Sequence, residues 1–213
     1  MSTARRWRAF GPTAALLELD DLDAVLGLRA RIEDERDAGR LVQLLEVVPA
    51  ARTLLLRCAT PQDLGTVAAD VDRLEPLAAA DRGTGLEPVR LAVRYDGPDL
   101  EDVADLLGIE PAEVRARHLR TRWTVAFTGF APGFGYLVAD GDSGLEVPRL
   151  EQPRTSVPAG AVGLAGEFSG VYPRSSPGGW RLIGTCSTPT WDEDRDPPAV
   201  LRPGTRVVFE ESP

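Results

Sequence analysis

The hydrophobic pattern of the first half alternates between short apolar runs and stretches with helical spacing. Runs rich in Leu, Val and Ala predict strands, and two of them flank residues 49–52 as the arms of a hairpin. The predicted strands are residues 14–19, 41–48, 53–58 and 89–93, and the predicted helices are residues 22–36 and 60–74. Thr60 and Pro61 supply the second helix with a hydroxyl cap and a first-turn proline. This strand-helix-strand-strand-helix-strand order is typical of a ferredoxin-like sandwich.

The second half has a different pattern, in which short strands are separated by glycine and proline. Runs at 123–127, 161–165, 180–183 and 206–209 predict a β-barrel or sandwich. Before them, residues 99–114 resemble a helix-turn-helix. Six acidic side chains in that segment would repel DNA phosphates, so we favour a helical pair packed on a barrel.

The change of pattern predicts an α+β chain of two domains. We expect one domain over residues 1–86 and another over residues 87–213, with a linker near residues 81–85. The strand at 89–93 follows the linker and could belong to either half.

Composition excludes several classes of chemistry. The 213 residues carry a net charge of −9, which argues against a nucleic-acid partner. The sequence has no lysine, and so no Schiff-base lysine, no P-loop lysine and no lysine that could carry biotin. One histidine and two isolated cysteines give no metal-ligand cluster, so we expect no metal. Without a long apolar run or an apolar signal core, we expect a cytoplasmic protein with no membrane contact.

Candidate chemistry is concentrated in the loops of the second half. Residues 129–137 form an aromatic loop rich in glycine, which either presents backbone N–H groups to an anion or carbonyl or is a tight barrel turn. Arg149 and Arg154 each follow a proline and could bind carboxylate or phosphate, although their spacing alone favours ordinary surface salt bridges. His118 is the one side chain that titrates near neutral pH unaided, and it is either structural or part of a site. The sequence has no GxSxG elbow and its one histidine leaves little room for a Ser-His-Asp triad, so we expect no self-sufficient catalytic machinery in this chain.

Several loop motifs, in order, resemble one family. They are YDGPDL (95–100), the Arg-His pair at 117–118, GFAPGFGYL (129–137), VPAGAVGLAGEFSGVYP (157–173), SPGGWRLIGT (176–185) and PGTRVVF (203–209), with a looser match at VVPAARTLLL (47–56). They are similar to the carboxyltransferase-type family that includes the B subunit of 5-oxoprolinase, also called allophanate hydrolase subunit 1, and the kinase inhibitor KipI. The family commonly has Gln-Thr where this chain has Phe168 and Ser169, which leaves the substrate open.

The resemblance implies a fold, partners and a reaction. The fold would be an N-terminal ferredoxin-like sandwich followed by a C-terminal cyclophilin-like barrel. The partners would be the homologous C subunit (allophanate hydrolase subunit 2 type) and a LamB/YcsF-type A subunit. Together they would open 5-oxoproline to glutamate with ATP, which partner subunits hold or share. Alternatives are a KipI-like histidine-kinase inhibitor, and an allophanate hydrolase or urea carboxylase-type carboxyltransferase subunit.

The resemblance and the loops together define the expected site. We expect catalytic roles for His118, Arg149 and Arg154, with His118 as acid or base and the two arginines holding carboxylate or phosphate. The expected substrate-binding residues are Gly133, Tyr136, Phe168, Ser176, Gly178, Gly179 and Trp180.

Overall fold

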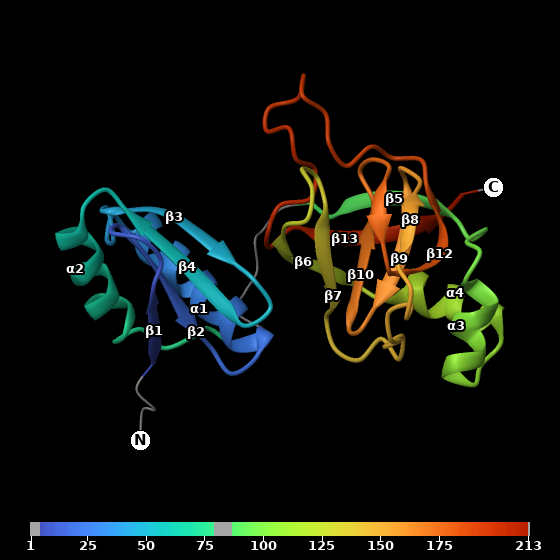
Figure 1. The fold of residues 1–213 in the computed structure, drawn as a ribbon, viewed down its shortest axis with the longest axis horizontal. Coiled ribbons are helices and arrows are strands. Elements are labelled where there is room, and N and C mark those ends of the chain that lie inside the picture. Colours follow the sequence, from blue (N-terminus) through green and yellow to red (C-terminus); the bar gives the residue numbers. More distant parts are fainter. Residues whose placement is uncertain (1–4, 79–86, 213) are drawn as a thin grey trace. The chain divides into compact units, whose positions relative to one another are not determined.

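The computed structural model describes residues 5–78 and 87–212, and the chain divides into two compact units (Figure 1). The first unit is Met1–Gly83 and the second is Thr84–Pro213. The expected linker near residues 81–85 lies outside the described residues. No helix in the described ranges is long and apolar enough to cross a membrane.

The first unit is a four-stranded antiparallel sheet with two helices on one face. The sheet order is β1-β2-β4-β3, and its elements are β1 (Arg6–Ala9), β2 (Ala14–Glu18), α1 (Leu22–Asp37), β3 (Leu44–Pro49), β4 (Thr53–Cys58) and α2 (Pro61–Val71). Leu17, Leu54 and Leu56 point from the sheet into one core with residues of both helices. Thr60 caps α2 by accepting a hydrogen bond from the Asp63 N–H, as its sequence predicts.

The strand order differs from the predicted one at a single position. The predicted hairpin is confirmed, because β3 pairs with β4 around residues 50–52. Residues 89–93 instead join the barrel, and the edge position beside β2 is taken by β1. The prediction missed β1 because Arg-Trp-Arg-Ala is a mostly exposed edge strand whose alternation covers only four residues.

The second unit is a closed seven-stranded barrel, which confirms the predicted α+β class. The barrel order is β10-β7-β6-β13-β5-β12-β9, and β8 pairs with β11 as a separate ribbon. The barrel strands are β5 (Val89–Arg94), β6 (Trp123–Thr128), β7 (Gly135–Ala139), β9 (Ala161–Ala165), β10 (Phe168–Val171), β12 (Arg181–Cys186) and β13 (Arg206–Glu211), and the ribbon strands are β8 (Arg154–Val157) and β11 (Ser176–Gly178). The four runs predicted at 123–127, 161–165, 180–183 and 206–209 each correspond to a barrel strand, although β12 and β13 extend further at their carboxyl ends.

Two buried clusters lie on opposite faces of the barrel wall, because side chains alternate along a strand. Ser169 and Val171 point to the face that packs with Leu137 and Val125 inside the barrel. Phe168 points to the other face, where an aromatic cluster forms. The outer face of this wall therefore carries the aromatic residues that the sequence placed in the candidate site.

A helical pair packs against the barrel, as the acidic helix-turn-helix segment predicted. Helix α3 (Leu100–Leu107) ends at Gly108 in the left-handed conformation, and α4 (Pro111–Arg120) follows. Val103 and Val114 are fully buried against the barrel core. The pair is thus a structural part of the second unit.

Candidate functional site

The glycine-rich loop between β6 and β7 contains two successive tight turns. The Ala131 N–H donates to the Gly129 carbonyl at 2.7 Å, which closes a three-residue turn around Phe130 at φ 68°. The Phe134 N–H then donates to the Ala131 carbonyl at 3.0 Å, with Pro132 and Gly133 (φ 81°) in the middle positions of a type II turn. A γ-turn with a left-handed, non-glycine centre is rare and strained, and such strain is concentrated at functional positions.

This strained turn places the Phe130 ring at the open edge of the aromatic cluster. Phe130 is 56% exposed, yet its ring centroid lies 5.3 Å from that of Phe134 and 5.9 Å from that of Tyr172 in edge-to-face contacts. Such contacts contribute about 0.5–1.5 kcal/mol per pair beyond burial. An exposed phenyl held in this way offers an apolar surface to a ligand.

The predicted residues Tyr136, Phe168 and Trp180 come together beneath it. Tyr136 stacks on Phe127 at 4.4 Å, and Phe168 meets both rings edge-on at 5.6 Å. The Trp180 ring lies 5.5 Å from Tyr136. Residues that are distant in the sequence thus share one aromatic surface on the barrel wall.

Close packing requires the first of the two glycines before Trp180, whereas the second has room for a side chain. A Cβ on Gly178 would lie 2.4 Å from the Tyr172 hydroxyl, and one on Gly179 would lie 3.6 Å from Pro153. The Gly179 carbonyl accepts a hydrogen bond from the Leu150 N–H at 2.8 Å. Ser176 lies in β11 and donates only a long hydrogen bond, 3.4 Å, to the Arg174 carbonyl.

The Leu150 hydrogen bond anchors Arg149 beside the aromatic surface. Its guanidinium carbon lies 6.0 Å from the centre of the Trp180 ring, a cation–π arrangement. The side chain is exposed and forms no ion pair with any residue that the structure describes. Arg149 therefore presents an unneutralised charge next to an apolar aromatic face, which suits a ring that bears a carboxylate.

Arg154 has a different role from the one expected. Its Nη2 binds Asp99 Oδ1 at 2.6 Å, and its Nη1 reaches the Trp180 carbonyl at 3.4 Å. Asp99 is buried, and its other oxygen accepts the Leu182 N–H at 2.6 Å. Because this buried carboxylate already occupies the guanidinium, Arg154 neutralises Asp99 and joins β8 to β12 rather than holding a substrate anion.

His118 is likewise a structural residue. It is fully buried on α4, with the Tyr95 hydroxyl 2.7 Å from Nδ1 and the Ser169 Oγ 2.8 Å from Nε2. The ring packs 4.2 Å from that of Phe209, and burial lowers the pKa of His118 from 6.5 to about 3. An imidazole enclosed in the barrel core between two hydrogen-bond partners fits the structural one of the two roles expected for His118.

Acidification tests this burial. The unfolded chain binds the proton near pH 6.5 and the folded chain only near pH 3, so the stability that His118 contributes is present above pH 6.5 and lost as the pH falls. We expect the free energy of unfolding to fall by about 2 kcal/mol between pH 7 and pH 5. Carboxylates with lowered pKa, such as Glu113, titrate below 4.5 and outside this window. Urea unfolding measures the change, and a His118→Gln variant with the same pH slope as the wild type would contradict it.

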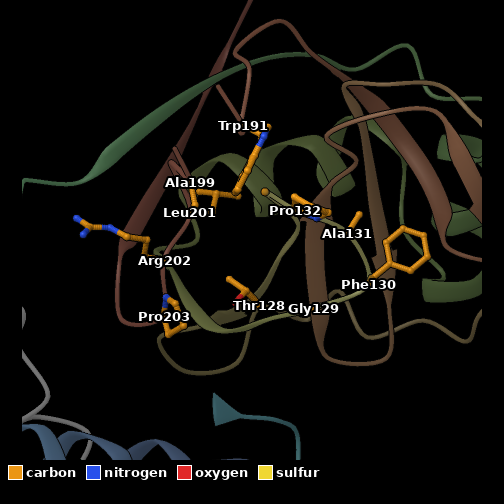
Figure 2. Close-up of a pocket in the computed structure, with 11 residues that line it drawn as sticks. Thr128, Gly129, Phe130, Ala131, Pro132, Trp191, Ala199, Leu201, Arg202 and Pro203 are labelled. Carbon is orange, nitrogen blue, oxygen red and sulfur yellow. The ribbon is translucent and has the colours of Figure 1, made fainter. Parts of the chain in front are cut away.

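A pocket of about 510 Å³ lies beside the glycine-rich loop (Figure 2). It is lined by Thr128, Gly129, Phe130, Ala131, Pro132, Gly133, Trp191, Ala199, Leu201, Arg202 and Pro203. In Figure 2 the Phe130 ring points away from the hollow, and Trp191 lies across it from residues 128 and 129. The same loop therefore borders both the aromatic surface and this pocket.

The structure thus brings most of the expected residues together and adds others. Tyr136, Phe168, Gly178, Trp180 and Arg149 lie in or against the aromatic cluster, Gly133 packs against Trp191 and Gly179 against Pro153, whereas His118 and Arg154 are held by internal partners. Sequence reasoning missed Phe130 as a site residue and the lining of the pocket by the loop 187–205. Trp191, a large aromatic next to an acidic run, was the available signal. Among the described residues, no three His, Cys, Asp or Glu side chains gather as a metal site.

Two bacterial proteins, each named as the B subunit of 5-oxoprolinase, are similar to this chain. The Escherichia coli O157:H7 protein is 37% identical over 209 residues, which cover 93% of this chain and 92% of that protein. The Bacillus subtilis (strain 168) protein is 40% identical over 147 residues, which cover 68% of this chain and 61% of that protein.

Solved structures agree with these relatives. The crystal structure of TTHA0988 superposes with a TM-score of 0.75 at 35% identity over 94% of this chain, which spans only 40% of the TTHA0988 chain. The urea amidolyase of K. lactis has the same fold at 18% identity, with a TM-score of 0.72 over 98% of this chain and 15% of its own.

The family model agrees with the loop motifs. The model for the carboxyltransferase domain, subdomain C and D, matches residues 5–201. The resemblance that the motifs predicted is therefore confirmed, and the chain belongs to the carboxyltransferase domain, subdomain C and D, family.

Proposed function

We propose that this chain is the B subunit of an ATP-dependent 5-oxoprolinase, which converts 5-oxoproline, ATP and water to glutamate, ADP and phosphate. The observation that carries the proposal is the 37% identity to a protein named as the B subunit of 5-oxoprolinase, over nearly the full length of both chains. The enzyme would be a hydrolase in which this chain acts only together with partner subunits.

The geometry of the aromatic surface supports this substrate class. A lactam is flat because its amide has partial double-bond character, and a flat ring stacks on aromatic side chains. The half-buried rings of Tyr136 and Phe168 supply such a surface above the buried Trp180, and Arg149 supplies a charge for the ring carboxylate at its edge. Phe168 disfavours substrates that have a polar substituent at its position, because an edge-on phenyl ring offers no hydrogen bond to such a group.

The residues of this chain do not fit a nucleotide triphosphate. There is no lysine and no P-loop in the sequence, and the segment beside the pocket carries Asp192, Glu193 and Asp194. Phosphate binding needs converging N–H donors and positive charge, and these carboxylates would repel it. We therefore place ATP on the partners, the homologous C subunit and the LamB/YcsF-type A subunit, and assign this chain to binding and orienting the ring.

Replacing Arg149 with alanine tests the assigned carboxylate contact. A charge-assisted hydrogen bond contributes about 1.5–3 kcal/mol, so we expect kcat/KM for 5-oxoproline in the assembled enzyme to fall about 10- to 100-fold. KM should carry most of the change, because the carboxylate does not react. Arg149→Lys keeps the charge and should recover part of the loss.

The matched control is Arg52→Ala, an exposed arginine of the first unit. It should leave kcat and KM unchanged. If the Arg149→Ala enzyme assembles to the same extent and keeps the wild-type kcat/KM, Arg149 does not bind the substrate carboxylate.

Assembly itself is tested by co-expression with the two partner types. A complex that contains all three chains supports the proposal. A chain that associates with neither partner would contradict it and favour a kinase-inhibitor module instead.

A further inference from the structure

The pocket beside the glycine-rich loop is an apolar hollow without a charged group directed into it. Trp191, Pro132 and Leu201 surround it, and the Arg202 guanidinium points away from it (Figure 2). Its volume of about 510 Å³ is within the usual range of binding cavities. The hollow thus suits an apolar group, and its chemistry differs from that of the aromatic surface with its adjacent guanidinium.

The walls of the pocket are fixed before anything binds. A Cβ on Gly133 would lie 2.7 Å from the Trp191 Cβ and 3.0 Å from the Thr190 carbonyl, so the two loops are in direct contact. Trp191 pairs with Ala199 in an isolated antiparallel bridge, and the Val200 N–H donates to the Thr190 carbonyl at 3.1 Å. A preformed cavity of this kind binds at a low cost in conformational entropy.

One edge of the pocket, at Trp191 and Ala199, continues into a strongly acidic loop. The Trp191–Ala199 bridge closes a loop whose tip carries Asp192, Glu193, Asp194 and Asp196, which we call the acidic tip. All four are exposed, and none forms an ion pair with the residues that the structure describes. Arg195 is the one positive charge within this tip. The acidic tip is therefore complementary to a basic surface, while the pocket lining itself contributes one exposed arginine, Arg202.

A protein side chain fits these features better than a small anion does. A nucleotide base could stack on Trp191, but its phosphates would meet the acidic tip. A protein segment can present an apolar side chain to the hollow and lysine or arginine to the acidic tip. An apolar anchor with polar or charged residues around it is the usual arrangement in protein interfaces.

We infer that this pocket is a docking site, in which a partner subunit inserts one large apolar side chain flanked by basic residues that meet the acidic tip. This inference rests on the proposed function, because it requires the chain to act within a complex. Docking there would bring the partner against the same 129–133 loop that borders the aromatic surface. A partner bound at this place would complete the substrate site from one side.

Two variants test the docking site in the complex with co-expressed subunits. Ala199→Phe fills the pocket. The triple change Asp192→Lys, Glu193→Lys and Asp194→Lys reverses the charge of the acidic tip. We expect each to weaken association at least 10-fold, measured as Kd by biolayer interferometry, with thermal unfolding unchanged. Raising the salt concentration should weaken wild-type assembly and not that of the triple variant.

The matched control reverses three exposed carboxylates elsewhere in the same unit. Glu101, Asp105 and Glu110 lie on α3 and the turn after it, and their replacement by lysine should leave Kd within about twofold of the wild type. Trp191 fluorescence supplies a readout that does not depend on affinity. Its emission should shift on assembly, and the shift should be absent in Trp191→Phe.

The outcomes separate this inference from the proposed function. A complex that turns over 5-oxoproline and keeps wild-type Kd in both variants overturns the docking site alone. A wild-type chain that binds no candidate partner overturns both. ATP binding by the chain by itself, abolished in Ala199→Phe, would replace the docking site with a nucleotide pocket.

Discussion

Replacing Gly97 with alanine is expected to prevent the second unit from folding. A Cβ at this position would lie 2.3 Å from the backbone of Ile183 and from the Leu182 carbonyl oxygen, and 2.4 Å from the Gly184 nitrogen. These are backbone atoms of the barrel strand β12, which cannot move aside as a flexible side chain can. Gly97 belongs to the YDGPDL motif, so the close approach gives a physical reason for the glycine there.

We expect the free energy of unfolding to fall by more than about 4 kcal/mol, a loss typical of substitutions that disrupt the backbone or the core packing. The measurement is the unfolding transition of the second unit, followed by the fluorescence of its buried tryptophans Trp123 and Trp180. Gly166→Ala is the matched control, because Gly166 has φ 55° and a Cβ added there would meet nothing within 4 Å. It should cost about 1–2 kcal/mol from conformation alone. Equal effects of the two variants would contradict the close approach.

The second large effect is expected for Arg154→Ala. The variant leaves the buried Asp99 without its cation, although the Leu182 N–H still donates to it. Removing one partner of a buried pair costs about 3–5 kcal/mol, and we expect the lower end because the Arg154 side chain is 29% exposed. Urea unfolding measures the loss.

The control for this prediction is the double variant Arg154→Ala with Asp99→Asn. It removes the uncompensated charge while the amide oxygen keeps the Leu182 hydrogen bond, so it should lose less stability than Arg154→Ala alone. A double variant that is less stable than the single one would show that the ion pair does not dominate. An Arg154→Ala protein that keeps its stability but no longer binds substrate would show that Arg154 is a substrate-binding residue.

The fold was predictable where local chemistry determines it. The hairpin at β3 and β4 and the capped start of α2 follow from turn and cap residues, and the structure has both. The partner of a strand was not predictable in the same way. The apolar pattern of residues 89–93 would suit either unit, and their pairing with β13 and β12 places them in the barrel.

The site was predictable from residue types but not from the roles of charged groups. Arg149 and Arg154 look alike in sequence, each following a proline, and they differ only in what lies near them. Asp99 lies 55 residues before Arg154, so the ion pair that occupies Arg154 has no local signal. His118 was expected to titrate for the same reason, since its enclosure depends on Tyr95 and Ser169, which are distant in the chain.

The main feature that the sequence did not predict is the role of the loop after β12 in lining the pocket. Read locally, its acidic run is a solvated turn, and that description holds for the side chains themselves, which are exposed. Its significance comes from Trp191 and Ala199, which pair across the loop and place its base against Gly133.

The central claim is that this chain is required for hydrolysis of 5-oxoproline by a complex of three kinds of chain. The direct test is the rate of ADP release with 5-oxoproline from the three co-expressed subunits, with and without this chain. We predict substrate-dependent ADP release only when all three are present. Equal release without this chain, or none from a well-folded complex that contains it, would contradict the account.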